Sequence, residues 1–572
     1  MKTTVYNLFK CCLIMGLAAC SDETLNPADT LYIRGNIITV DNDKPLVEAL
    51  ATKDGLILAV GATDELLILK GPLTKVIDLR GQTVVPGFID AHSHFAGVGT
   101  QAMVANLLPA PDGPVNTIAE LQAEIRHHIE TSPIVKKYNV AIGFNYDDSQ
   151  LAEKRHPDRH DLDAVSTEIP IVVMHQSGHL GAYNSKALEL MGISAATPDP
   201  SGGVIERQTD GKTPSGVMQE NAHFMIFFKL IPDFTRPDLM ELYKAGEYAY
   251  LSNGFTTVQE GKTDLNTLRL LPELAASMGF DVDIISYPDV AGIADDAVLA
   301  ELPFSSGYVN GFRIGGIKLT FDGSPQGKTA WFTEPYLKVP EGQPSKYSGY
   351  PAFSDENALK WMSLAFDNHW QLLVHANGDA AIDQLIRLVE QSGGQLEGKD
   401  HRTVMIHGQF TRQDQVKRLQ DLGVFPALYP MHTFYWGDWH RDSVAGPERA
   451  QHISPTGWMI DEDMMFSIHS DAPVTFPNSM RLLDSAVNRT TRSGRVLGLE
   501  HRISPQNALK ALTIWAAYQH FEESIKGSLV AGKQADLVIL DQDPLTVEPL
   551  ELKNIKVMAT INNDKTVFTR ID

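Results

Sequence analysis

Six ionisable residues stand at or near the ends of apolar runs that have the composition of buried β-strands. The set consists of His92 and His94 after "VVPGFID", Lys318 in "FRIGGIKLTFDGS", His375 ending "QLLVH", His407 ending "TVMIH" and Asp471 after "MMFSIHS". Because side chains alternate faces along a strand, His92 and His94 are expected to point the same way. Gathering so many polar groups is costly unless they bind something, and imidazole and carboxylate are natural ligands of zinc. The pattern therefore favours a metal site.

Each of these residues also has a plain structural explanation when it is taken alone. His375 or His407 would serve as a core histidine bonded to the backbone, and Lys318 as a lysine paired with an acid. Asp471 would serve as a helix cap before Pro473. A lone His-x-His pair is weak evidence of a site. Six such residues at the ends of inner strands are harder to explain in this way than as one binding site.

The middle of the chain alternates strand-like and helix-like segments. Helical periodicity predicts helices over residues 356–369, 380–394 and 412–423, and apolar runs between and after them predict strands. Such alternation is typical of βα units around a parallel sheet. About eight units fit between residues 86 and 512, which predicts an α/β fold with a closed (β/α)8 TIM-type barrel. In that barrel the active site lies at the carboxyl ends of the strands.

The two ends of the chain are rich in short β-type runs separated by turn residues. We expect residues 31–85 and 513–572 to form one small β-sandwich domain built from both termini. The barrel span exceeds the roughly 250 residues typical of this fold. We place the excess at about residues 100–251, as an insertion that could cover the site.

The composition and net charge of the chain disfavour some classes of binding partner. The chain has 572 residues, a formal net charge of -23 and 43% hydrophobic residues. This length supports a large core and more than one domain. The acidic balance disfavours nucleic acid and anionic lipid surfaces, which would repel the protein. After the N-terminal segment no apolar run of about 20 residues appears, so no membrane-spanning helix is expected.

The N-terminal sequence predicts a lipoprotein signal peptide over residues 1–19, followed by a polar tether over 20–30. Lys2 and Lys10 precede an apolar run that ends in "LAAC", a lipobox-like tetrad with Cys20 as the acylated residue. The alternative is an ordinary signal peptide cut at small residues. All three cysteines lie in this segment, so no disulfide framework or cysteine ligand is expected in the body. The lipobox-like tetrad predicts the bacterial cell envelope. Ser21 after Cys20, where no Asp stands, predicts the outer membrane, facing the periplasm, if two membranes are present.

Several motifs together carry a family resemblance that covers nearly all of the mature chain. "PGFIDAHSHF", "VHANGD", "IHG", "SDAP" and the closing "KGSLVAGKQADLVILDQDP" resemble the metal-dependent amidohydrolase superfamily. "SGHLGAYNSKAL", "SGGVIERQTDGKTPSGVMQENA" and "MHTFYWGDWHRD" are similar to its amidohydrolase-3 branch, which includes N-substituted formamide deformylases. Relatives in this superfamily are often dimers, although no motif here indicates an interface.

The resemblance assigns roles to the six residues. It implies that His92 and His94 hold one zinc-type ion, and that His375 and His407 hold a second ion or share the first. Lys318 matches the position of a carboxylated lysine that bridges two metals, and the alternative is an unmodified lysine beside one metal. Asp471 would bind metal and accept the proton of the attacking water.

The reaction is expected to break a carbon–nitrogen bond of an N-acyl, N-formyl or cyclic amide. Deaminases of this superfamily usually carry a Glu three residues after the strand-five histidine, where this chain has Gly378. His179, His432 and Trp436 are candidate substrate-binding residues, and the aromatic run over 429–439 predicts an apolar wall or, alternatively, core packing. Three alternatives remain: a deaminase of amino-heterocycles, an inactive lipid-anchored binding protein, and a structural envelope lipoprotein.

Overall fold

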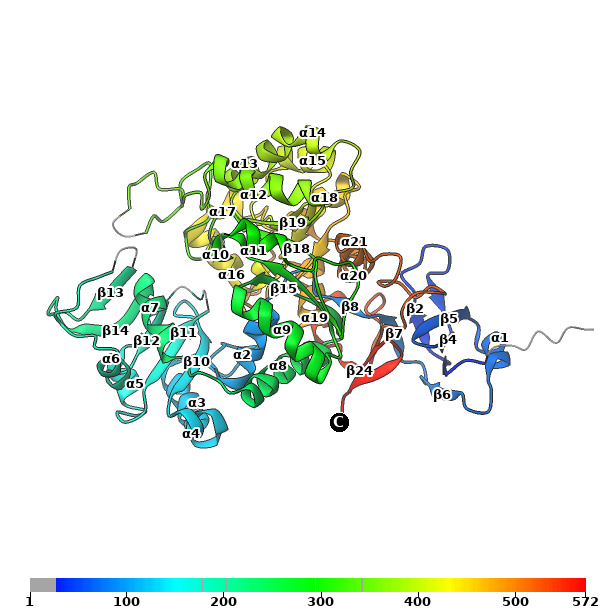
Figure 1. Cartoon of the computed structure of the whole chain (residues 1–572), viewed down its shortest axis with the longest axis horizontal. Helices are drawn as coiled ribbons and strands as arrows, with labels where there is room; N and C mark the ends of the chain where they lie inside the picture. The colour runs from blue at the N-terminus through cyan, green and yellow to red at the C-terminus, as the bar shows by residue number, and fades with distance from the viewer. Residues whose placement is uncertain are drawn as a thin grey trace, which may run out of the picture.

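The computed structural model describes residues 27–571, apart from residues 177, 179, 201–202, 294 and 341–342. The predicted signal and the lipid anchor at Cys20 lie outside the described residues. Within those ranges, no helix is both long enough and apolar enough to cross a membrane. Figure 1 shows a large central part of helices and strands, a lobe on one side that contains β10 to β14, and a strand-rich part on the other that holds β1 to β7 and the C-terminal β24.

Two parallel sheets form the centre of the molecule. The first has the strand order β17-β16-β15-β8 and the second β18-β19-β20-β21-β22. Every pair within them is parallel. Their bounds are β8 (Phe88–Ile89), β15 (Phe255–Thr263), β16 (Asp283–Pro288), β17 (Phe312–Ile314), β18 (Gly316–Thr320), β19 (Gln371–Ala376), β20 (Val404–His407), β21 (Phe425–Leu428) and β22 (Ser467–Ile468). Parallel strands bring their carboxyl ends to one edge, where the candidate residues lie.

The strands described here do not close into a hydrogen-bonded barrel, so the prediction of a closed (β/α)8 barrel is not met in that detail. Only Gly315 separates β17 from β18, and one isolated bridge joins Asp289 to Lys318. β8 and β22 are each two residues long and share no ladder. Two backbone hydrogen bonds nevertheless connect the segments that follow them, from Asp471 N to His92 O (3.0 Å) and from His94 N to Ala472 O (2.7 Å).

Amphipathic helices lie between these strands in the chain, and they pack apolar faces on the main core. The predicted helices correspond to α12 (Asp355–Asp367), α13 (Asp379–Gln391) and α15 (Gln413–Asp421). Ser354 begins α12 by accepting a hydrogen bond from Asn357 N, which is the usual role of serine before a helix. Leu385, Leu388 and Leu419 are fully buried among the barrel-type strands.

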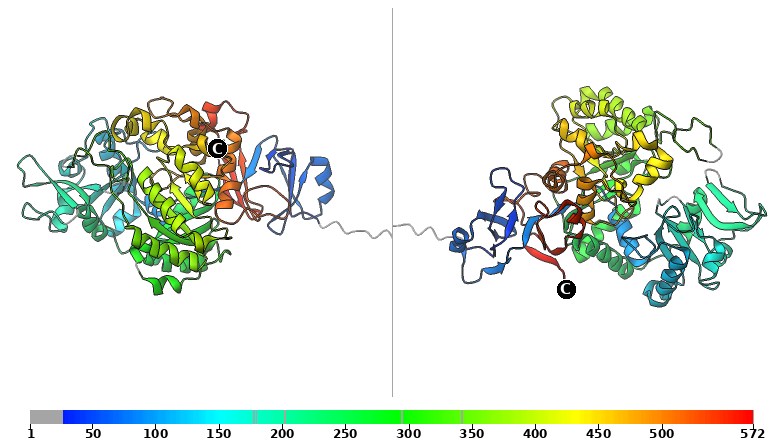
Figure 2. Two further views of the ribbon diagram at one scale, coloured as in Figure 1. Left: turned by 90° about the horizontal axis from the view of Figure 1, so that it is seen from above. Right: turned by 180° about the vertical axis from the view of Figure 1, so that it is seen from behind.

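A separate six-stranded sheet occupies most of the predicted insertion. Its strand order is β13-β14-β12-β11-β10-β9, and it is parallel from β9 to β11 and antiparallel beyond. The bounds are β9 (Ala105–Asn106), β10 (Ala141–Tyr146), β11 (Ile171–His175), β12 (Leu180–Tyr183), β13 (Gly203–Arg207) and β14 (Pro214–Glu220). The sheet has its own apolar cores on both sides, and Figure 2 shows it as a distinct lobe.

Strands from both chain ends share one sheet, with the order β25-β24-β23-β7-β2-β3. It joins β2 (Asn36–Ile38), β3 (Leu46–Val47) and β7 (Thr83–Pro86) to β23 (Leu537–Leu540), β24 (Val557–Asn562) and β25 (Lys565–Thr569). A second sheet has the order β5-β4-β1-β6 and packs with it around a shared apolar core that includes Tyr32 and Leu537. It contains β4 (Ala49–Lys53), β5 (Leu56–Gly61) and β6 (Lys75–Asp78). The predicted tether ends earlier than expected, because Ala28 is buried and β1 (Thr30–Ile33) begins at Thr30.

Candidate active site

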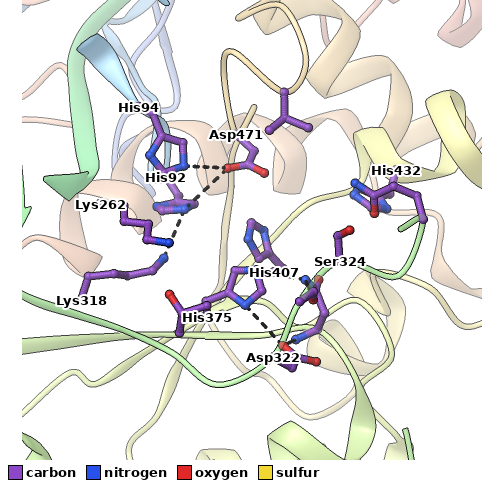
Figure 3. Close-up of a pocket in the computed structure, with 15 residues that line it drawn as sticks. His92, His94, Lys262, Lys318, Asp322, Ser324, His375, His407, His432 and Asp471 are labelled. Carbon is purple, nitrogen blue, oxygen red and sulfur yellow. Dashed lines mark hydrogen bonds and ion pairs between the residues drawn. The ribbon is translucent and has the colours of Figure 1, made fainter. Parts of the chain in front are cut away.

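A cavity of about 230 Å³ opens at the carboxyl ends of the parallel strands (Figure 3). All six predicted ligands line it: His92, His94, Lys318, His375, His407 and Asp471. Other lining residues are mostly polar, namely Lys262, Thr320, Asp322, Gly323, Ser324, Gln326, Asn377, His432 and Val474. The structure therefore brings together residues that are up to 379 positions apart in the chain, from 92 to 471.

His92 and His94 both face Asp471. Asp471 Oδ1 lies 3.6 Å from His92 Nε2 and 3.4 Å from His94 Nε2. Both histidines follow the short β8 and lie beyond its last residue, yet their Nε2 atoms face the same carboxylate. Asp471 has a left-handed backbone (φ 54°), which costs a non-glycine residue about 1–3 kcal/mol and is typical of functional sites.

Neighbouring groups orient His92 for coordination. Its Nδ1 lies 3.0 Å from Gln259 Oε1, which can only accept, so the ring proton is on Nδ1 and the lone pair on Nε2. A histidine that ligates a metal usually donates its other N–H to such a partner. Burial lowers the pKa of His92 well below its ordinary value, and nearby Lys318 adds to the shift. The imidazole is therefore neutral and able to bind a cation.

Lys318 lies among the predicted ligands, and Lys262 also lines this cavity. Lys318 is 1% exposed, and its Nζ lies 3.3 Å from His92 Nε2. Burial lowers the pKa of Lys318 to about 7. A neutral amine is the form that reacts with CO2, so the environment suits carboxylation of this side chain.

His375 and His407 form the other side of the cluster, with ring centroids 4.6 Å apart. His375 Nδ1 lies 3.3 Å from Asp322 Oδ1, and its Nε2 lies 3.2 Å from Asn377 Nδ2. His407 Nδ1 is buried and has no hydrogen-bond partner in the part of the chain that the structure describes, and the His407 backbone is left-handed (φ 73°). Burial lowers the pKa of both histidines.

The sequence interpretation missed two residues of this site. Asp322 is fully buried and lines the cavity beside His375. His469 is buried beneath the cavity, with ring centroids 5.3 Å from His92 and 5.1 Å from His407, and neither of its ring nitrogens meets hydrogen-bond geometry. His469 stands two residues before Asp471, so the alternation that picked out His92 and His94 would also have found it.

The side chains present fit a divalent metal ion. Ligand atoms of His92, His94 and Asp471 lie within 4.8 Å of one another, and so do those of His407, His469 and Asp471. Neutral imidazoles and a carboxylate are the donor set of zinc sites. Buried ring nitrogens without partners are costly unless something else binds them, which an ion in this cluster would do.

The predicted substrate-binding residues have different placements. His432 lines the cavity, whereas Trp436 does not and lies 5% exposed against the His432 ring. His179 lies outside the described residues. The predicted strand-exit loop is instead helix α16 (Met431–Trp439), and Tyr429, Tyr435 and Trp436 are buried. Burial of these side chains favours core packing as the explanation of this aromatic run.

The contact with His440 determines which ring nitrogen of His432 carries the proton. Its Nδ1 lies 2.9 Å from Nε2 of His440, whose Nδ1 is buried without a partner. An orphaned buried N–H is rarer than an orphaned acceptor, so His440 carries its proton on Nε2 and donates it to His432. His432 then carries its own proton on Nε2. Burial holds the pKa of His432 well below its ordinary value, so the ring stays a neutral donor.

No side chain can stand at position 378 without a change of backbone. An ideal Cβ on Gly378 would overlap the carbonyl oxygen of Trp331. Asp322 holds this arrangement, because its Oδ2 accepts hydrogen bonds from Gly378 N (2.8 Å) and Trp331 N (2.9 Å). The glutamate that deaminases use at this position therefore has no room here.

Known proteins and one family model are similar to this chain over most of its length. The chain is 27% identical to N-substituted formamide deformylase of Arthrobacter pascens, covering 93% of this chain and 97% of that protein. It is 28% identical to the protein LONG AFTER FAR-RED 3 of Arabidopsis thaliana, covering 90% and 87%. A crystal structure of an uncharacterized metal-dependent hydrolase from Pyrococcus horikoshii shares the fold, with a TM-score of 0.71, 23% identity, and 91% and 99% coverage. Residues 75–568 match the model of the amidohydrolase family. The chain therefore belongs to the amidohydrolase family.

Proposed function

We propose that this protein is a divalent-metal-dependent hydrolase that cleaves a carbon–nitrogen bond, other than a peptide bond, in a small amide. Membership of the amidohydrolase family supports this class of reaction, and similarity to a formamide deformylase supports an amide. The observation that carries the proposal is the convergence of His92 Nε2 and His94 Nε2 on Asp471 Oδ1, beside a buried lysine.

The metal is proposed to be zinc, held by His92, His94 and Asp471, with His375 and His407 holding a second ion or sharing the first. Carboxylation of Lys318 would turn an amine that cannot ligate a cation into an anionic bridge between two ions. When bound, a divalent ion of this kind lowers the pKa of a coordinated water to about 7 and polarises a carbonyl oxygen.

Asp471 and His432 supply the remaining chemistry. Asp471 is placed to take a proton from the attacking water and to pass it to the leaving nitrogen. His432 lines the cavity, and its Nε2–H would be a neutral donor for the oxygen of the tetrahedral intermediate. A donor that is already oriented by His440 needs no reorganisation when charge develops on that oxygen.

The cavity lining favours a small polar substrate. Among the described residues, Thr320 Oγ1 and Gln326 Oε1 are buried there without hydrogen-bond partners, and Val474 is the single aliphatic side chain that lines the cavity. We therefore propose N-acyl or N-formyl amines, or cyclic amides, of modest size. The products are a carboxylic acid and an amine, or one chain that carries both groups.

Matched panels test this proposal against deamination. The metal-loaded enzyme is incubated with N-formyl and N-acyl amines and with amino-heterocycles, and both acid and ammonia are measured. We expect acid from the amides, because Gly378 leaves no side chain in place to protonate a ring nitrogen. Ammonia from the heterocycles with no acid from any amide would establish a deaminase instead. No turnover of either panel would favour a binding protein.

The cell envelope is the proposed location, with a lipid on Cys20 as the anchor. The support is the sequence "LAAC" with a basic start and an apolar run before it.

A further inference from the structure

A second cluster of nitrogen and oxygen ligands lies apart from the active-site cavity. It consists of His452, Glu500 and His501, none of which lines that cavity. His452 follows helix α17 (Gly446–Ala450), while Glu500 and His501 belong to the 3-10 turn η3 (Leu499–His501). Two segments about 50 positions apart in the chain therefore present one carboxylate and two imidazoles to a common point.

The spacing of the three ligand atoms matches a tetrahedral ion. His452 Nδ1 lies 3.1 Å from His501 Nε2 and 3.3 Å from Glu500 Oε1, and His501 Nε2 lies 3.8 Å from Glu500 Oε1. Zinc–nitrogen and zinc–oxygen bonds of about 2.0–2.1 Å at tetrahedral angles place ligand atoms about 3.4 Å apart. The three observed distances bracket this value. In the proposed active site, the distances from Asp471 to His92 and His94 fall in the same range.

The surroundings hold the histidines in place while leaving one side accessible. The side chain of His501 is fully buried, whereas those of His452 and Glu500 are 43% and 49% exposed. The Trp458 ring stacks on His452 and meets His501 edge-on, with both centroid distances 4.7 Å. Packing against Trp458 restricts both imidazoles, and restricted ligands lose less entropy on binding. An ion could enter from the solvent side and keep one open position.

We propose that His452, Glu500 and His501 bind a divalent transition-metal ion, with zinc as the best match, at a site separate from the active-site metal. Two imidazoles and one carboxylate are the ligand types that zinc, nickel and copper accept. Such an ion would link the segment after α17 to η3 and so stabilise the folded chain. Without an ion, His501 Nε2 donates its proton to His452 Nδ1, because His501 Nδ1 is buried without a hydrogen-bond partner among the described residues, and Glu500 lies at ion-pair distance from both rings. An ion would displace this proton from Nε2, and the two cases therefore differ in what they bind.

Metal stoichiometry and tryptophan fluorescence distinguish these cases. The zinc-loaded holoenzyme is desalted and its zinc content is measured for wild type, His452→Ala and Glu500→Gln. Exposed His127 provides a matched control, His127→Ala. Nickel is then titrated into each protein while fluorescence is recorded, since a paramagnetic ion beside Trp458 should quench it. Trp458→Phe identifies the share of the quench that comes from this ring.

We expect wild type and His127→Ala to hold one equivalent of zinc more than His452→Ala, with Glu500→Gln binding more weakly than wild type. A saturable nickel quench should disappear in His452→Ala and Trp458→Phe. Zinc should raise the Tm of wild type more than that of His452→Ala, while kcat is the same in both. Equal zinc content in wild type and His452→Ala, or an unchanged quench in His452→Ala, would overturn the proposal. Active-site turnover is measured separately, so a failure of the proposed function would not affect this result.

Discussion

Nδ1 of His375 lies 3.3 Å from Oδ1 of Asp322, a carboxylate that accepts hydrogen bonds from the backbone N–H groups of Asn377, Gly378 and Trp331. One buried acid therefore orients a proposed metal ligand and fixes the loop beside it. Outer partners of this kind typically affect metal affinity by 10- to 100-fold.

Asp322→Asn tests this positioning role. In one orientation the amide nitrogen would face the N–H of Asn377, and in the other the N–H groups of Gly378 and Trp331, so at least one hydrogen bond must be lost. We expect metal affinity to fall by about 10- to 100-fold, with a smaller loss of kcat once metal is saturating. Metal titration and saturated kinetics separate the two effects. Unchanged affinity in a correctly folded variant would show that Asp322 supports only the loop.

Asp471→Asn tests the proton path. The side chain keeps its shape, and an amide oxygen can still ligate weakly, so most of the metal should remain. Turnover should fall by about 10²- to 10⁴-fold, the usual contribution of a positioned acid–base group. Metal content is measured on the same samples as kcat. Near-normal turnover would remove Asp471 from proton transfer.

Lys318→Ala tests the bridging carbamate. Removing the bridge should lower metal content and activity together, and formate or acetate should restore part of both by filling the space. Bicarbonate dependence of metal uptake in wild type is a second readout. Full metal content and full rate in Lys318→Ala would mean that no bridge exists.

Variants of His432 and His440 test whether His432 stabilises the negative charge that develops on the substrate oxygen. His432→Phe should lower kcat by about 10²- to 10³-fold, which is the effect of losing one oriented donor to an oxyanion. His440→Phe leaves His432 in place but releases its tautomer, so a smaller loss is expected. A change in KM alone, with kcat preserved in both variants, would make His432 a binding residue only.

Cys20→Ser tests the proposed anchor. Without the thiol, acylation cannot occur and processing should stall or shift. Detergent-phase partitioning of wild type and variant measures the anchor directly. We expect the mature wild type in the detergent phase, and any variant that is cleaved at a shifted site in the aqueous phase. A wild type found wholly in the aqueous phase would contradict the lipid anchor.

The sequence was informative where a local rule connects residue type to position. His375 and His407 stand at the ends of apolar runs, and the runs are β19 and β20. Asp322 follows its strand by two residues and lies in a loop, where alternation no longer predicts direction, so it was not recognised. Closure of the barrel depends on pairing between β8 and β22, which are very short and far apart in the chain. The periodicity of the sequence does not predict such pairing.

The position of the aromatic run over 429–439 could not be predicted for a different reason. Dense aromatic residues have the same composition in a pocket wall and in a core, and only the turn into α16 decides which side chains face inward. The structure places Trp436 behind His432, where it packs against the ring without lining the cavity.

The crowding at Gly378 also limits which new reactions this enzyme can acquire by a single substitution. A single substitution to glutamate would place Cβ against the carbonyl oxygen of Trp331, whose own N–H is held by Asp322. The loop that contains Trp331 would have to move before any side chain at position 378 became useful. Laboratory evolution toward deamination should therefore stall at one-step variants of Gly378, and successful lineages should first acquire changes in the segment between Asp322 and Trp331.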